Sequence, residues 1–263
     1  MTRFTGLKLA VILAVVGFMA GIALAGEKAA PAEAGKKVNV LLVTGGHGFD
    51  EKPFLAVFEG MTDITFKHVV QKSPSDLFED IADWPYDAIV LYNYNQKMSD
   101  KQRENLLKLL DKGVGLFVMH HAIAAYPDWP EFIEIFGAKY YLAPTPDHPR
   151  SIFKHDVDLK VHVEDAEHPI TKGLTDYTIH DETYGKYTVS PGVHVLLTTD
   201  EPTSEKIIGW VKLYKKARVA FIESGHDSKA YANPNFITLT DRAIQWVAGR
   251  LPEGNLTPAK AEK

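Results

Sequence analysis

The hydrophobic positions of this chain fall into short runs that predict the strands of a sheet. Residues 38–44 (VNVLLVT), 86–91 (YDAIVL) and 115–119 (GLFVM) are almost continuously apolar, which is typical of strands buried on both faces. Residues 64–70 (ITFKHVV) alternate between apolar and polar positions, as a half-buried strand does. We therefore expect these segments to form strands in the first half of the chain.

Segments with helical character lie between and after these strands. They are residues 53–60, 75–81, 99–112 and 129–136. The third is the clearest, because Ser99 and Gln102 stand where a capping box requires them and Gly113 follows as a stop. Strands that alternate with helices in this way predict a doubly wound α/β fold with a mostly parallel sheet.

The second half of the chain has a different pattern, in which strand follows strand. Strand-like segments lie at residues 159–164, 176–179, 194–198, 207–213 and 218–223. The last two are joined by residues 214–217 and predict a hairpin. A closing helix is expected over 235–249, where apolar residues recur at helical spacing. One α/β domain with an antiparallel extension in its C-terminal half is the simplest interpretation.

The first 25 residues have the pattern of a secretory signal peptide. Arg3 and Lys8 give a positive start, residues 9–22 are apolar, and Ala23-Leu24-Ala25 forms a small-x-small cleavage pattern. A membrane anchor is the alternative, but a span needs about 20 apolar residues, so we favour cleavage after Ala25. The mature protein is then expected in the periplasm or outside the cell, with no membrane attachment.

The remaining chain divides into three expected parts. They are a flexible leader at 26–37, the folded domain at 38–250 and a polar tail at 251–263.

The composition excludes several classes of protein. The chain has 263 residues, of which 45% are hydrophobic and 24% charged, and this ordinary globular composition excludes a disordered or coiled-coil protein. A formal net charge of -5 gives no sign of a basic nucleic-acid surface, so we expect no nucleic-acid partner. The chain has no cysteine, which excludes a disulfide, a thiolate metal site and a cysteine nucleophile.

Histidine, amide and carboxylate side chains follow the predicted strands at the points where those strands end. They are His47, Asn93, Asn95, the pair His120-His121, the triplet His180-Asp181-Glu182, and His226. Ligands of open α/β sheets bind beyond the carboxyl ends of the strands, so we expect these residues to line one crevice. Consecutive strand residues point to opposite faces, so one of His120 and His121 is expected to be a hydrogen-bonded core residue instead.

The pattern leaves the kind of site open. The HExxH spacing of a helix-borne zinc pair is absent, as are a phosphate-binding loop and the GxSxG of serine hydrolases. Scattered histidines and carboxylates still bind zinc, manganese or nickel in other proteins. We predict His47, His120 and His226 as the ligands if a divalent metal is bound.

Several segments, taken in order, resemble the ThuA-like (trehalose utilisation) family. They are VLLVTGGHGFDEKPF, GVGLFVMHHAIA, HPITKGL, HDETY, and RVAFIESGHD with NPNFITLTDRAIQWVAGR. The resemblance spans roughly Val38 to Arg250 and implies a flavodoxin-like fold, similar to that of class I glutamine amidotransferases. Those enzymes carry a cysteine nucleophile on a tight strand-to-helix turn, where this chain has His120. Amidotransferase chemistry by that route is therefore excluded.

The resemblance also implies a role in sugar catabolism, with a disaccharide or its 3-keto derivative as substrate. In the hypothesis of an enzyme, His120, Glu182 and His180 are catalytic. A metal polarises a sugar carbonyl while Glu182 or a histidine removes the adjacent proton, which is isomerase, epimerase or lyase chemistry. Hydrolysis of a glycosidic bond by two carboxylates is the alternative mechanism.

Substrate contacts are expected from a further group of side chains. They are His47, Asn93, Asn95, His121, Asp181 and Tyr184. A second hypothesis keeps the same crevice without catalysis, as a module that binds a carbohydrate or a partner protein. Metal analysis and a test of sugar turnover separate the two hypotheses.

Overall fold

The computed structural model describes residues 1–2 and 36–258 of the chain. Nearly all of the expected signal peptide and of the expected leader therefore lies outside the described residues. Among the helices of the described part, none is long and apolar enough to cross a membrane.

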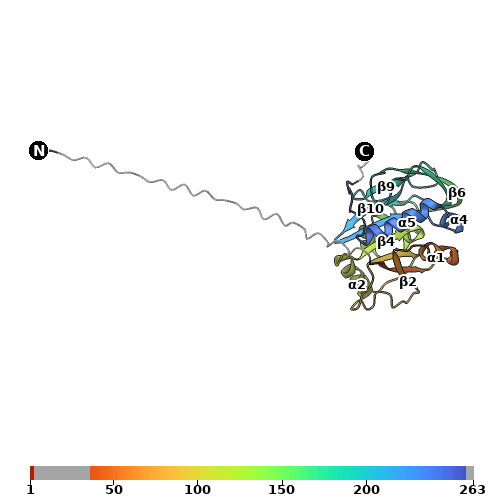
Figure 1. Cartoon of the computed structure of the whole chain (residues 1–263), viewed down its shortest axis with the longest axis horizontal. Helices are drawn as coiled ribbons and strands as arrows, with labels where there is room; N and C mark the ends of the chain where they lie inside the picture. The colour runs from red at the N-terminus through yellow and green to blue at the C-terminus, as the bar shows by residue number, and fades with distance from the viewer. Residues whose placement is uncertain (3–35, 259–263) are drawn as a thin grey trace.

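A central sheet organises the domain (Figure 1). Its strands are β1 (Val38–Gly45), β2 (Ile64–Val70), β3 (Ala88–Asn93), β4 (Gly115–Met119), β6 (Ile152–Val163), β7 (Tyr177–Gly185), β9 (His194–Thr198), β10 (Ile207–Tyr214) and β11 (Ala217–Ile222). In the described residues they form one nine-stranded sheet of order β2-β1-β3-β4-β11-β10-β9-β6-β7. The strands from β2 to β11 in this order pair in parallel, and those beyond β11 pair antiparallel. The predicted flavodoxin-like fold with an antiparallel extension is confirmed.

Helices cover both faces of the parallel strands, which explains why the inner strands β1, β3 and β4 are almost continuously apolar. The helices are α1 (Glu51–Glu59), α2 (Asp100–Asp111), the 3-10 helix η1 (His120–Ala124), α3 (Pro130–Phe136), α4 (Ser228–Tyr231) and α5 (Pro234–Val247). Val40 and Leu42 of β1 pack on the face covered by α1 and α5. Leu41 and Val43 pack on the opposite face, which α2 and α3 cover. Alternate residues of one strand thus enter two different cores.

Several elements lie where the sequence predicts them. The capping box of Ser99 and Gln102 opens α2, and β10 and β11 form the predicted hairpin, with Tyr214 opposite Ala217. The closing helix is α5. Two short strands, β5 (Ala138–Lys139) and β8 (Thr188–Val189), pair with each other apart from the main sheet.

The predicted helix at 75–81 is wrong, because this segment forms turns. Phe78 has a φ of 66°, in the left-handed region, which a right-handed helix does not allow. Side chains of α2 bind the carbonyl groups instead of helical partners. Gln102 Nε2 donates to Ser75 O at 2.5 Å, and Asn105 Nδ2 donates to Phe78 O at 2.8 Å. The segment is therefore held by tertiary contacts, which the local sequence pattern does not predict.

The segment after α5 makes contacts with the domain as far as Thr257. Leu251 and Leu256 lie against the core, and Trp246 Nε1 donates to Glu253 O at 3.0 Å. His194 Nδ1 donates to Thr257 O at 2.7 Å. The part of the expected polar tail that is described is thus bound through its backbone and two leucines.

Candidate functional site

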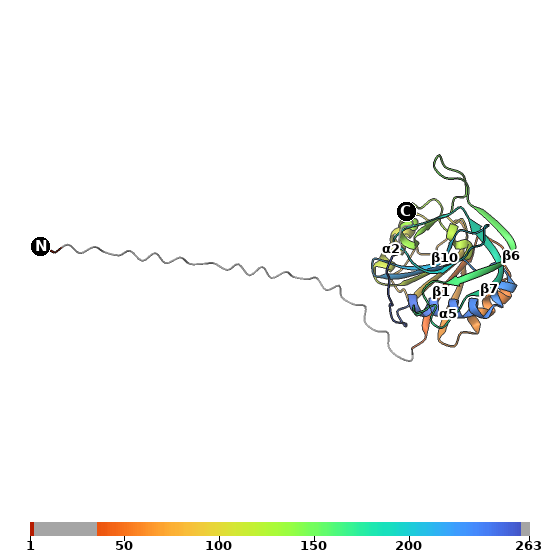
Figure 2. The same cartoon turned by 90° about the horizontal axis from the view of Figure 1, so that it is seen from above.

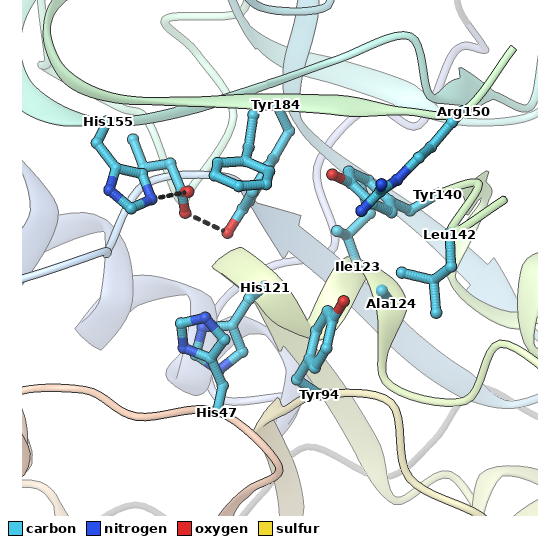
Figure 3. Close-up of a pocket in the computed structure, with 12 residues that line it drawn as sticks. His47, Tyr94, His121, Ile123, Ala124, Tyr140, Leu142, Arg150, His155 and Tyr184 are labelled. Carbon is cyan, nitrogen blue, oxygen red and sulfur yellow. Dashed lines mark hydrogen bonds and ion pairs between the residues drawn. The ribbon is translucent and has the colours of Figure 1, made fainter.

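A pocket of about 230 Å³ opens at the carboxyl ends of β1, β3 and β4 (Figure 3). Its lining residues are His47, Tyr94, His121, Ile123, Ala124, Tyr140, Leu142, Arg150, Phe153, His155, Glu182 and Tyr184. Residues that follow β1, β3 and β4 and residues of β6 and β7 thus reach one cavity, although they are far apart in the sequence. This is the edge of the sheet where the sequence predicts a crevice.

His120 is the first residue of η1, directly after β4, and its backbone makes a tight left-handed turn. Its φ is 49°, an uncommon value for a residue with a side chain, and the strain marks a constrained position. The turn places the imidazole in the protein interior, where Nδ1 donates to the main-chain O of Glu223 at 2.7 Å. That bond fixes a proton on Nδ1 and turns Nε2 toward Tyr184 Oη at 2.9 Å and Glu182 Oε2 at 3.2 Å.

The same turn explains how both neighbouring histidines come to the site. The strand rule that opposite faces alternate does not apply, because His120 is already the first residue of η1. His121 is buried, lines the pocket, and donates from Nε2 to Tyr92 O at 3.0 Å. Its ring packs against that of His47, with 4.6 Å between centroids. Burial lowers the pKa of His47 and, more strongly, that of His121, so both rings are neutral at pH 7.

Glu182 is the carboxylate around which the imidazoles gather. His155 Nε2 lies 2.7 Å from Oε1, and Tyr184 donates its hydroxyl to Oε2 at 2.7 Å. His226 Nδ1 lies 3.2 Å from Oε2. Burial alone would raise the pKa of Glu182, but the adjoining imidazoles of His120 and His226 outweigh it and hold this pKa well below its usual range. The group is therefore a carboxylate at pH 7.

His120, Glu182 and His226 have the geometry of a metal-binding group. One ligand atom from each lies within 4.8 Å of the others. The 3.2 Å from Glu182 Oε2 to each imidazole nitrogen is close to the roughly 3.3 Å between ligands of a tetrahedral zinc ion, given bonds of about 2.0–2.1 Å. The buried Nδ1 of His226 makes no hydrogen bond of regular geometry in the described residues, although it lies 3.2 Å from Glu182 Oε2. An imidazole nitrogen that is placed in this way can serve as a metal ligand.

The protons around His120 support the same interpretation. Nδ1 carries the proton donated to Glu223 O, and the hydroxyl proton of Tyr184 goes to Glu182. Nε2 of His120 therefore faces two oxygen atoms that offer it no proton. Either a second proton on Nε2 or a cation between the three residues satisfies these electron pairs.

Other predicted site residues lie elsewhere. Asp181 is buried and accepts the backbone N–H groups of Gly225 at 2.8 Å and His226 at 2.9 Å, so it holds the turn after β11. Asn93 is buried and donates to Gln71 Oε1 at 2.6 Å. Asn95 is exposed and does not line the pocket.

His180 also lies outside the pocket. Its ring sits between Asp158 at 2.8 Å and Asp156 at 3.2 Å. The sequence places the triplet after a short strand, whereas β7 continues through it to Gly185, so His180 is a residue of the strand itself. In the metal-binding group Glu182 stands beside His120 and His226, and the predicted ligand His47 does not belong to it.

The sequence pattern misses His155, Arg150 and Phe153. The predicted strand begins at residue 159, whereas β6 begins at Ile152 and carries a bulge near Asp156, whose φ is 57°. This bulge turns the start of β6 toward the pocket. The start of β6 is exposed, and its sequence gives no signal of that bulge.

Glu223 forms a second layer behind the site. Its side chain is fully buried, and burial raises its pKa to about 8. It accepts the hydroxyl proton of Tyr187 at 2.8 Å and that of Ser204 at 3.1 Å. The residue therefore positions His120 through its main chain and does not line the pocket.

Comparison with known proteins identifies the group to which this architecture belongs. The sequence model of the family ThuA, described as trehalose utilisation, matches residues 39–247. No curated protein matches the chain.

Solved structures show the same fold at low identity. A ThuA-like protein from Parabacteroides merdae is 21% identical, with a TM-score of 0.69 over 86% of this chain and 93% of that one. A ThuA-like protein from Bacteroides uniformis is 20% identical, with a TM-score of 0.60 over 87% and 98%. A cytoplasmic protein from Salmonella typhimurium is 12% identical, with a TM-score of 0.56 over 79% and 98%.

Proposed function

This chain belongs to the ThuA family of trehalose utilisation, and from that premise we propose that its pocket is the active site of a carbohydrate-processing enzyme. The observation that carries the proposal is Glu182, a buried carboxylate in contact with His120, His155 and His226. The substrate is a disaccharide or a keto-glycoside, and the reaction is acid–base chemistry next to a sugar carbonyl. Burial of several titratable side chains together costs free energy of folding. Clusters of this kind are therefore concentrated at functional sites.

We propose His120, Glu182 and His226 as the residues that hold a divalent metal such as zinc. When bound, the metal supplies Lewis-acid polarisation of the substrate carbonyl. The main-chain O of Glu223 holds the Nδ1 proton of His120 and so keeps Nε2 directed at the site. Tyr184 orients the carboxylate of Glu182 through its hydroxyl.

A general base is available on the side of the pocket where β6 begins. The side chain of His155 is half exposed, and its Nε2 contacts Glu182 Oε1. A carboxylate that accepts the Nε2 proton leaves the Nδ1 lone pair of His155 free to take a proton from the substrate. His47 is a second neutral imidazole in the same pocket. These positions favour isomerase, epimerase or lyase chemistry.

The two-carboxylate hydrolase is less well supported. Among the described residues that line the pocket, Glu182 is the only acidic one. Asp181 and Glu223 are buried behind it and bind backbone or side-chain donors. A glycosidase of that type needs a second carboxyl group facing the substrate.

The test combines metal analysis with turnover. The purified protein is analysed for zinc, manganese and nickel, and assayed against trehalose, 3-keto-trehalose and matching glucosides before and after chelation. We expect Glu182→Gln and His155→Asn to lower kcat by about 10²–10⁴-fold, the usual contribution of a positioned acid or base. His162→Asn is the matched control, because His162 also lies on β6 but pairs with Asp176 at the surface.

Full turnover by Glu182→Gln would contradict the assignment. Binding of these sugars by calorimetry without any turnover would favour the non-catalytic module instead. We also propose that the protein works in the periplasm or outside the cell, because residues 1–25 have the pattern of a secretory signal peptide. Cell fractionation, with N-terminal sequencing of the mature protein, tests that proposal.

A further inference from the structure

Arg150 is the one lysine or arginine among the described residues that line the pocket. It makes no ion pair or hydrogen bond with any described residue, unlike other arginines of the domain. Arg218 donates to Leu251 O at 2.7 Å, and Arg242 donates to Lys172 O at 2.6 Å. A guanidinium group without a protein partner at the wall of a cavity is available to a ligand.

The backbone at Arg150 is fixed although its side chain is free. The next residue, Ser151, is buried, and its Oγ accepts from Tyr141 N at 2.9 Å and donates to Lys186 O at 2.6 Å. These bonds close the base of the segment 142–150, which projects from the domain just before β6 in Figure 2. Figure 3 shows the Arg150 side chain beside Tyr140, on the far side of Tyr184 from His155. The cation therefore lies away from the proposed reacting centre.

An outer depression continues the pocket at this point. It is lined by Arg150, Ser151, Ile152 and Phe153, so it shares Arg150 and Phe153 with the main pocket. Phe153 is 55% exposed and Ile152 40% exposed, which is unusual for large apolar side chains. The inner cavity of about 230 Å³ is smaller than the roughly 300–1,000 Å³ of pockets for drug-sized ligands. The second unit of a disaccharide would therefore lie over this depression.

We propose that Arg150 and Phe153 form an outer subsite that binds an anionic group, a carboxylate or a phosphate ester, on the second unit of the substrate. This inference rests on the proposed function and narrows its substrate class to acidic glycosides. The guanidinium fork matches two oxygen atoms of either anion, and the exposed ring of Phe153 covers the apolar face of the sugar. The formal charge of the chain is -5, so anions gain no general attraction, and their recognition depends on this local cation.

The test compares two pairs of disaccharides that differ in one anionic group. They are cellobiose against cellobiouronic acid, and trehalose against trehalose 6-phosphate, each titrated by calorimetry at low salt. We expect the acidic member of at least one pair to bind 10-fold or more tightly than its neutral partner. The pair that shows this preference identifies the anion as a carboxylate or a phosphate.

Three variants and one control separate the effect of charge from that of stacking. Arg150→Gln should abolish the preference without changing the affinity for the neutral sugar, and Arg150→Lys should retain part of it. Phe153→Ser should weaken the acidic and the neutral sugars by the same factor. Lys160→Gln removes one positive charge from an exposed position elsewhere on β6 and should leave every affinity unchanged.

Several outcomes would overturn the subsite. They are equal affinity within both pairs, a preference that survives Arg150→Gln, an equal loss in Lys160→Gln, or no binding of any of the four sugars. The same experiments test the proposed function independently of the outer subsite. Turnover of a keto-glycoside that depends on Glu182, together with equal affinity within both pairs of disaccharides, rejects the outer subsite alone. A preference that depends on Arg150 together with full turnover by Glu182→Gln rejects the active-site assignment alone.

Discussion

His168 is a buried histidine whose protonation opposes folding. Its side chain is 1% exposed and packs against the rings of Trp246 and His194. Nδ1 accepts the backbone N–H of Ile170 at 3.2 Å, and Nε2 has no partner in the described residues. Burial lowers the pKa of His168 from 6.5 to about 4. The folded protein therefore holds this ring neutral at a pH where the unfolded chain protonates it.

The sign and size of the effect follow from linkage. The folded pKa lies below the unfolded one, so the stabilisation is present above pH 6.5 and is lost as the pH falls toward 4. The full difference corresponds to about 3.4 kcal/mol, at about 1.4 kcal/mol for each pKa unit. At pH 5 the unfolded histidine is almost fully protonated and the folded one is not, so about 2 kcal/mol of the free energy of unfolding is lost.

Urea unfolding at pH 8 and pH 5 measures this loss. We expect His168→Asn to be less stable than the wild type at pH 8, because the smaller side chain leaves a cavity. Its amide oxygen can still accept from Ile170 N, and its stability should fall by about 2 kcal/mol less than that of the wild type between the two pH values. His148→Asn, in an exposed hairpin, should keep the wild-type pH dependence. Equal losses in wild type and His168→Asn would refute the reasoning.

Three further predictions concern the site and its frame. Glu182→Gln should lower zinc affinity at least 10-fold in a competition titration with a chromogenic chelator, and unchanged affinity would reject Glu182 as a ligand. Gly225→Ala should lower the free energy of unfolding by about 1–3 kcal/mol, because φ is 127° and the new Cβ would lie 2.9 Å from a ring carbon of Phe236; a wild-type urea midpoint would contradict this. Asp181→Asn removes an acceptor from the N–H groups of Gly225 and His226, which should cost about 1–3 kcal/mol in the same assay and weaken zinc binding. Wild-type zinc affinity in Asp181→Asn would show that His226 does not depend on this support.

Local patterns were sufficient for much of the fold. The unbroken apolar run at 38–44 predicts a strand covered on both faces, and β1 has alternate side chains in the two cores. The capping box at Ser99 and the hairpin at 214–217 are also predicted from residues that are close together in the sequence. The segment 75–81 is different, because side chains from α2 bind its carbonyl groups. Such contacts depend on the folded chain and have no local signature.

The candidate site divides in the same way. His47, His120 and His226 follow parallel strands, and the fold alone brings them to one edge. Two placements needed the structure. His180 lies outside because β7 continues to Gly185, and His155 lies inside because a bulge near Asp156 reorients the start of β6. Strand length and bulges are set by pairing with other strands, which the sequence of one segment does not encode.

The candidate site, taken as the pocket and the adjoining metal-binding group, draws on segments from His47, near the first strand, to His226, after the last. A ligand that bridges these segments cross-links the two ends of the folded chain, and the unfolded chain offers it no comparable site. Saturation at 100 times the dissociation constant would then add about 2.7 kcal/mol to the free energy of unfolding. The melting temperature should rise measurably with each true ligand, so a thermal screen of metals and sugars can identify them before any reaction is known.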